Sequence, residues 1–136
     1  MPPPRLSDED YQRLLAFRHQ LRQFDKWSSD QAAAHGLTQT QHQLLLAIRG
    51  HDDARGPTIG QLAGYLMVRH HTAVELADRT EKLGLVCRQG DGDDHRVVRL
   101  VLTPAGAARL AELTALHLEE LRRLAPTIGA LVSGLS

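Results

Sequence analysis

Polar side chains that suit contact with a nucleic acid gather at two places in the sequence. The first is VRHHTAVE, which carries Arg69, His70, His71 and Thr72 in succession and Glu75 one turn later. Guanidinium, imidazole and hydroxyl groups match the hydrogen bonds that phosphates and base edges offer, and a carboxylate can accept from the amino group of cytosine. These five residues are candidate DNA-binding residues. A merely solvated start of a helix is the alternative interpretation.

The second place is DGDDHRVVRL, where Arg96 follows a group of aspartates. An arginine that reaches a minor groove must be held in a defined pose, and Asp94, two residues earlier, can accept its guanidinium hydrogen bonds. Asp94 and Arg96 are therefore also candidate DNA-binding residues. An ordinary surface ion pair, worth about 0–1 kcal/mol, is the alternative.

The composition limits these ideas. The chain has 136 residues, 42% of them apolar, which suits a single compact domain with a real core. Its 16 basic and 16 acidic side chains give a formal net charge of zero, whereas nucleic-acid binders often carry a strong positive balance. DNA binding must therefore depend on where the charges lie and not on their sum.

The sequence also indicates the compartment. No apolar run approaches the ~18 residues that a membrane span needs, and MPPPRLSDEDY lacks the apolar segment of a signal peptide. The single cysteine, Cys87, cannot form an internal disulfide, which agrees with a reducing environment, and we expect it to be an inert core residue. We expect a cytoplasmic protein with no membrane partner.

Periodicity and capping residues predict the elements that position these side chains. Three S/T-x-x-D/Q patterns, beginning at Ser7, Thr38 and Thr58, are typical of helix starts. LVCRQG and VVRLVL flank a cluster of turn formers and predict a β-hairpin. Thr103-Pro104 then opens a last helix. The predicted order is helices over 7–34, 38–50, 58–66 and 69–83, a hairpin over 85–102, and a helix from 103 that ends at Pro126.

This order predicts a mainly α fold with a small β-hairpin, namely a winged helix-turn-helix flanked by long terminal helices. We expect one domain over residues 1–136, with the DNA-binding part at 37–103 and dimerisation helices at 7–34 and 104–135. A leucine-rich helix must bury its apolar stripe. The two terminal stripes are expected to pack on each other and on a second copy of the chain.

The run from Leu62 to Gly106 contains, in order, Thr72, Asp78-Arg79, Gly84-Leu85-Val86, Arg88, Asp94-His95-Arg96 and Leu100 to Gly106. With these residues it resembles the multiple antibiotic resistance regulator (MarR) family of bacterial winged-helix regulators, and the flanking helices extend the likeness over nearly the whole chain. The resemblance implies a homodimer, recognition helices in successive major grooves of a pseudo-palindromic operator, and wings that reach the minor groove. It also implies a repressor that a small phenolic or other aromatic ligand releases.

Three residues depart from the family pattern. His95 stands where a second arginine is common, Thr80 stands where leucine is usual, and Glu75 occupies a position that is often basic. Thr80 falls on the inward face of the recognition helix, so its hydroxyl must find a hydrogen-bond partner there. Glu75 leaves the base preference open, and His95 leaves open whether the wing makes one phosphate contact fewer.

An effector pocket is expected where the first, second and last helices meet the winged domain. His19, Arg22, Trp27 and His42 are the candidate ligand-binding residues, because aromatic walls with a few polar groups suit an aromatic acid. Plain core packing is the alternative for Trp27.

The sequence contains few residue patterns typical of a metal site, a cofactor site or a catalytic site. No two histidines have the i, i+4 spacing that lets one helix hold a metal ion, so we expect no metal and no cofactor, with a metal-responsive regulator as an alternative. The sequence contains no recognisable nucleophile–base set or phosphate loop, so we do not expect an enzyme. A winged-helix module for protein interaction is the other alternative function.

Overall fold

The computed structural model describes residues 1–92 and 94–134. Within them the order of helices and strands confirms the mainly α fold with a small hairpin that the sequence predicts. The elements are α1 (Asp8–Ala34), α2 (Gln39–Gly50), α3 (Ile59–Leu66), α4 (His70–Lys82), β1 (Val86–Asp91), β2 (Asp94–Leu102) and α5 (Pro104–Ser133).

Side-chain caps start four of these helices as predicted. The hydroxyls of Ser7, Thr38 and Thr58 each accept a hydrogen bond from the third residue of the helix, whose side chain returns one to the cap backbone. Thr103 caps α5, with proline at the first helical position. Helix α4 differs, because its N-cap residue, Arg69, makes no side-chain capping hydrogen bond.

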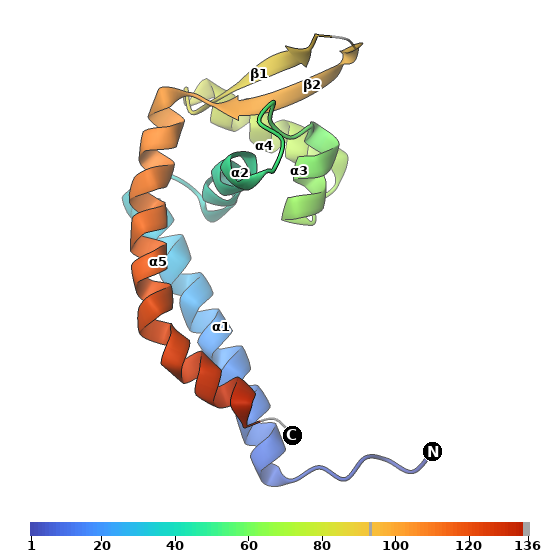
Figure 1. Ribbon diagram of the computed structural model, residues 1–136, viewed down its shortest axis with the longest axis vertical. Coiled ribbons are helices and arrows are strands. Elements are labelled where there is room, and N and C mark those ends of the chain that lie inside the picture. The colour runs from blue at the N-terminus through green and yellow to red at the C-terminus, as the bar shows by residue number, and fades with distance from the viewer. Residues whose placement is uncertain (93, 135–136) are drawn as a thin grey trace.

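The chain folds into a body and an arm. The body consists of α2, α3, α4 and the hairpin, together with the first turns of α5, whereas α1 and the rest of α5 run antiparallel to each other and form the arm (Figure 1). Near the far end of the arm the Arg13 guanidinium of α1 donates a hydrogen bond to the carbonyl of Gly134, just past α5. The arm therefore holds two segments from opposite ends of the sequence side by side.

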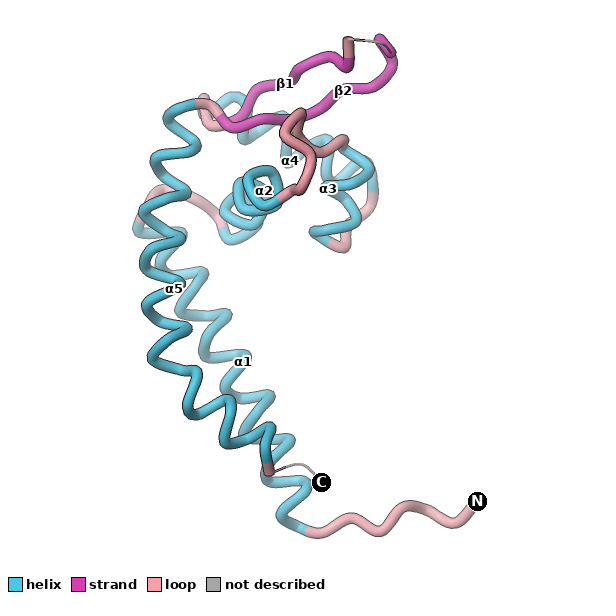
Figure 2. The backbone as a smooth tube through the Cα atoms, in the orientation of Figure 1, coloured by secondary structure: helices cyan, strands magenta, loops and turns pink. Residues whose placement is uncertain are grey.

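Helix α5 is longer than the sequence predicted. The expectation that it ends at Pro126 is wrong, because the helix continues to Ser133. Proline lacks an N–H, so it removes the hydrogen bond to the carbonyl of Arg122, and its ring bends the helix without having to end it. In agreement, α5 changes direction in its C-terminal third, where Pro126 lies (Figure 2).

The core lies in the body and includes the start of the arm. Thr80 of α4 is fully buried, and its hydroxyl donates to the Leu76 carbonyl at 2.7 Å, which confirms that this inward threonine needs a partner. Leu113 belongs to the same core, so the body anchors α5 well beyond its first turn. The largest side chains buried here are Leu44, Leu45, Leu62, Leu85, Leu100 and Leu113.

The hairpin is antiparallel, with Val86 opposite Leu102 and Cys87 opposite Val101. Val86 is 2% exposed and takes the inward position of β1. Cys87 is only half-buried, so the expectation of a core cysteine is wrong, because successive residues of a strand face opposite sides.

Gly106 marks a close approach between α5 and the base of the hairpin. A Cβ atom at Gly106 would lie 2.0 Å from the carbonyl oxygen of Leu85, a backbone atom that cannot move without displacing the hairpin. By contrast, a Cβ at Gly64, on the exposed side of α3, would meet no atom within 4 Å.

We expect Gly106→Ala to lower the free energy of unfolding by about 1–3 kcal/mol or more, because the added methyl overpacks the contact. Gly64→Ala, the matched control, should raise it by about 0.5–1 kcal/mol, since alanine is the better helix former. Equilibrium urea unfolding measures both. Similar effects of the two substitutions would contradict the close approach at Gly106.

Candidate nucleic-acid interface

Helices α3 and α4 form a helix-turn-helix. Met67, in the left-handed conformation at φ 56°, ends α3, and Arg69 precedes the first residue of α4. The inward face of α4 packs into the body through Ala73, Leu76 and Ala77. Its opposite face is left open to solvent, as an amphipathic helix on the surface requires.

The open face of α4 carries the residues that the sequence predicted. Arg69 lies at the N-cap, and His70, His71 and Thr72 fill the first turn, all of them exposed. Glu75 follows one turn later, with its side chain 63% exposed and one carboxylate oxygen 3.7 Å from Nη2 of Arg79. The structure thus brings five of the seven predicted DNA-binding residues onto one end of one helix.

The other two predicted residues belong to the wing, formed by β1 and β2. Arg96 is an exposed residue of β2 and takes part in a polar interaction within the chain. The side chain of Asp94 lies outside the described residues, so its role as a buttress for Arg96 stays a prediction. The wing extends from the body above α3 and α4 (Figure 1).

An ion-pair cluster that the sequence analysis did not assign joins the wing to α4. Arg88 of β1 donates to Asp78 at 2.5 Å and to Glu81 at 2.6 Å, and both carboxylates belong to α4. The hydrogen bond that Arg88 donates to Asp78 and the charge of Glu81 raise the pKa of the Arg88 guanidinium. The i, i+3 spacing of the two acids was the available signal, but their partner was not evident from the sequence.

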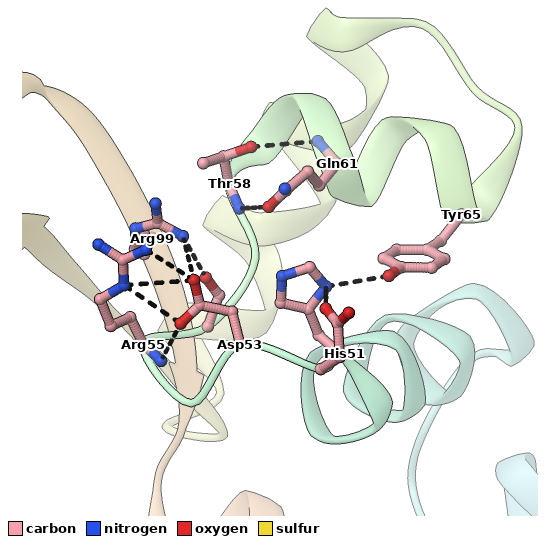
Figure 3. A network of polar contacts seen from close by, with 9 residues as sticks. His51, Asp53, Arg55, Thr58, Gln61, Tyr65 and Arg99 are labelled. Carbon is pink, nitrogen blue, oxygen red and sulfur yellow. Dashed lines mark hydrogen bonds and ion pairs between the residues drawn. The ribbon is translucent and has the colours of Figure 1, made fainter.

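A second unpredicted network lies in the loop between α2 and α3 (Figure 3). Arg55 donates to the Asp53 carboxylate through Nη2 at 2.7 Å and through its backbone N–H at 2.9 Å. These hydrogen bonds hold the pKa of Asp53 far below its usual range. Nη1 of Arg99, from β2, lies 3.8 Å from the same carboxylate.

The predicted ligand-binding residues separate into two groups. Trp27 and His42 both contact His117 of α5, with ring centroids 4.8 Å and 4.7 Å away. His19 and Arg22 are exposed on α1 and do not join them. Beside Trp27, a groove of about 360 Å³ runs between α1 and α5, with Phe24 and Trp27 as its aromatic wall.

His42 and His117 lie where α1, α2 and α5 meet. His117 donates from Nδ1 to the Leu113 carbonyl at 2.7 Å and lies 2.7 Å from the Ser28 hydroxyl through Nε2. His42 is 4% exposed, and its Nδ1 has no hydrogen-bond partner among the described residues. Burial first, and then the neighbouring His117 and His35, lower the pKa of His42.

Neither a metal-ion site nor a membrane-spanning helix is found among the described residues. In the part of the chain that the structure describes, no three His, Cys, Asp or Glu side chains are placed to share a metal ion. No described helix combines the length and apolarity that crossing a bilayer requires.

The buried His42 makes stability depend on pH. Its pKa in the folded chain lies below 6.5, the usual value for histidine, so the unfolded chain binds more protons once the pH falls under that value. The free energy of unfolding should therefore decrease on acidification from about pH 7 towards pH 5.

We expect His42→Leu to weaken this decrease, because the substitution removes the buried titrating group. His19→Gln, at an exposed position, is the control and should leave the pH dependence as it is. Urea unfolding at a series of pH values provides the comparison. An unaltered pH dependence in His42→Leu would show that other groups cause it.

Residues 35–97 match the MarR family model. Over 65 residues the chain is 40% identical to YsmB of Bacillus subtilis (strain 168), an uncharacterised HTH-type transcriptional regulator. This match covers 48% of the chain and 44% of YsmB, so it spans less than half the length of that relative.

Solved structures share the fold over most of the chain. AbsC of Streptomyces coelicolor, a MarR family transcriptional regulator, superimposes with a TM-score of 0.74 at 21% identity, covering 89% of this chain and 81% of AbsC. MepR of S. aureus, in its complex with DNA, gives a TM-score of 0.67 at 21% identity and covers 97% and 87%. Residues 35–97 thus match the MarR family model, and the chain shares the winged helix-turn-helix fold of these solved structures.

Proposed function

We propose that this chain is a homodimeric, sequence-specific DNA-binding regulator of transcription in the cytoplasm. The observation that carries the proposal is the exposed N-terminal end of α4, from Arg69 to Glu75. In a helix-turn-helix the second helix lies in the major groove with its N-terminal residues at the base edges. The solved complex of MepR with DNA shows that a protein of this fold binds DNA, which supports the same role here.

The neutral total charge does not oppose this role, because several acidic groups are neutralised within the body. Asp78 and Glu81 both bind Arg88, and no acidic residue lies in the first turn of α4. Glu75 is the acidic residue of α4 that stays mostly exposed, and Arg79 lies beside it. The first turn of α4 therefore carries no negative charge, although the chain as a whole is neutral.

The arm supplies the argument for a homodimer. Large apolar side chains on both of its helices are exposed in the single chain, and a contiguous stripe of this kind is normally covered by a partner. A second copy can cover this stripe symmetrically and hold the two copies of α4 at the spacing of two half-sites. The exposed side chains are Leu14, Leu15, Leu21, Leu118 and Leu121.

The groove between α1 and α5 supports a repressor that a small aromatic ligand releases. Its volume of about 360 Å³ lies within the range of small-molecule sites, about 300–1,000 Å³. Phe24 and Trp27 supply apolar surface, and Gln20, Gln23 and Arg123 supply polar groups. Because the groove lies in the arm, a ligand there would alter the distance between the two copies of α4 in the dimer.

The wild-type protein should bind a duplex with an inverted repeat, half-sites one helical turn apart, more tightly than random DNA, and less tightly as salt rises. Arg96→Ala should lower this affinity by about 1–3 kcal/mol, or roughly 5- to 150-fold, with the dimer intact. Lys26→Ala removes a matched positive charge from the arm and should have little effect.

Selection of duplexes from a random pool, followed by fluorescence anisotropy at fixed salt, provides the measurement. Equal affinity for the selected and random duplexes would refute sequence-specific binding. Loss of affinity in Lys26→Ala as large as in Arg96→Ala would refute a special role for the wing.

Leu15→Glu should convert the dimer to monomer, because the side chain is 67% exposed in the single chain and a charge there opposes burial by a partner. Leu46→Glu, at a 48% exposed position of α2, is the control and should leave the dimer unchanged. Light scattering after size-exclusion chromatography distinguishes the two states. A persistent Leu15→Glu dimer would place the interface elsewhere.

A further inference from the structure

We propose that Arg99 is a positioning residue for the wing: it locks β2 to the loop between α2 and α3 and so fixes where Arg96 is presented. This inference rests on the proposed DNA-binding function. It concerns a residue with a mostly buried side chain that makes its described contacts within the body.

The side chain of Arg99 is more buried than is usual for a charged residue. Its side chain is 13% exposed, and Nη1 donates to the carbonyl of Gly56 at 2.9 Å while lying 3.8 Å from the Asp53 carboxylate (Figure 3). The backbone of Arg99 also forms a β-bridge with Thr58. Side chain and backbone therefore both attach the middle of β2 to the same loop.

The loop that receives Arg99 is itself held in one conformation. Asp53 accepts from the backbone and guanidinium of Arg55, and the Gly56 N–H donates to the Asp53 carbonyl at 3.0 Å. Gly56 has φ +92°, and a Cβ there would lie 2.1 Å from the carbonyl oxygen of Leu100, so only glycine permits this approach. A rigid loop can transmit a defined position to the strand that binds it.

The two strands of the wing are anchored separately. Arg88 attaches β1 to Asp78 and Glu81 of α4, and Arg99 attaches β2 to the loop. A two-stranded hairpin has little stability of its own, so these attachments decide its direction. Arg96 lies three residues along β2 from Arg99, about 10 Å away along the strand. A small tilt of the hairpin at Arg99 therefore displaces the Arg96 side chain.

A double-mutant cycle separates positioning from direct contact. We expect Arg99→Met to weaken binding to the selected duplex by about 5- to 20-fold, because the misplaced Arg96 loses its contact. In the Arg96→Ala background the same substitution should change affinity less than about two-fold, since the contact is already gone. Arg99→Lys keeps the charge but not the planar fork, and should bind with intermediate affinity.

Two controls accompany the cycle. Lys26→Met removes a matched charge from the arm and should leave binding unchanged in both backgrounds. Asp53→Asn weakens the same attachment from the loop side and should repeat the non-additivity if Arg99→Met does not fold. Circular dichroism and light scattering confirm that each variant is a folded dimer.

Two outcomes overturn the inference while leaving the proposed function standing. One is fold-changes that multiply in the double variant, which would mean that Arg99 acts independently of Arg96. The other is an Arg99→Met protein that binds as the wild type does. A wild-type protein that selects no duplex would instead refute the proposed function, and the positioning role with it.

Discussion

The contact between the first turn of α5 and the backbone at Gly84 and Leu85 is the constraint on which the rest of the structure depends. Thr103 donates from its hydroxyl to the Gly84 carbonyl at 2.6 Å and from its N–H to the Leu85 carbonyl at 3.0 Å. Gly106 allows the helix to lie directly against Leu85. One short segment thus joins the end of α4, the start of β1 and the start of the arm, so the wing and the arm cannot reorient independently.

A second joint lies further down α5, and its chemistry is different. There His117 contacts His42 of α2 and Ser28 of α1, so aromatic and polar groups from three helices meet inside the molecule. A buried nitrogen without a partner costs free energy, and His42 carries one. The first joint is therefore fixed by backbone geometry, whereas the second contains a buried titratable group, His42.

The sequence predicted the parts of the fold that are determined locally. The capping pairs and the β-hairpin each involve residues a few positions apart, and the structure confirms them. The inward place of Thr80 followed from helical periodicity in the same way. Pro126 was misread because a local rule, that proline ends helices, yields where packing along α1 continues the helix.

The candidate site likewise has residues that local sequence predicts and contacts that only the assembled fold determines. Arg69 to Glu75 were found because consecutive residues at a helix start share one end of that helix, whatever the rest of the fold does. The attachment of Arg99 to Gly56 joins residues 43 positions apart, and no spacing within β2 signals it. Such contacts depend on how the loop lies against the sheet, which is a property of the assembled body.

The distribution of charge also follows from the assembled body. Folding pairs Asp78 and Glu81 with Arg88, and Asp53 with Arg55 and Arg99, so carboxylates that count against DNA binding in the sequence become supports for the wing. The same pairing uses up positive charge, since Arg88 binds two carboxylates of α4 and Arg99 binds the loop between α2 and α3. The DNA binding proposed above would then draw on base edges and groove shape as well as on phosphates. For that kind of recognition the placement of a few side chains matters more than their number, so the positioning role proposed for Arg99 fits a protein without net charge.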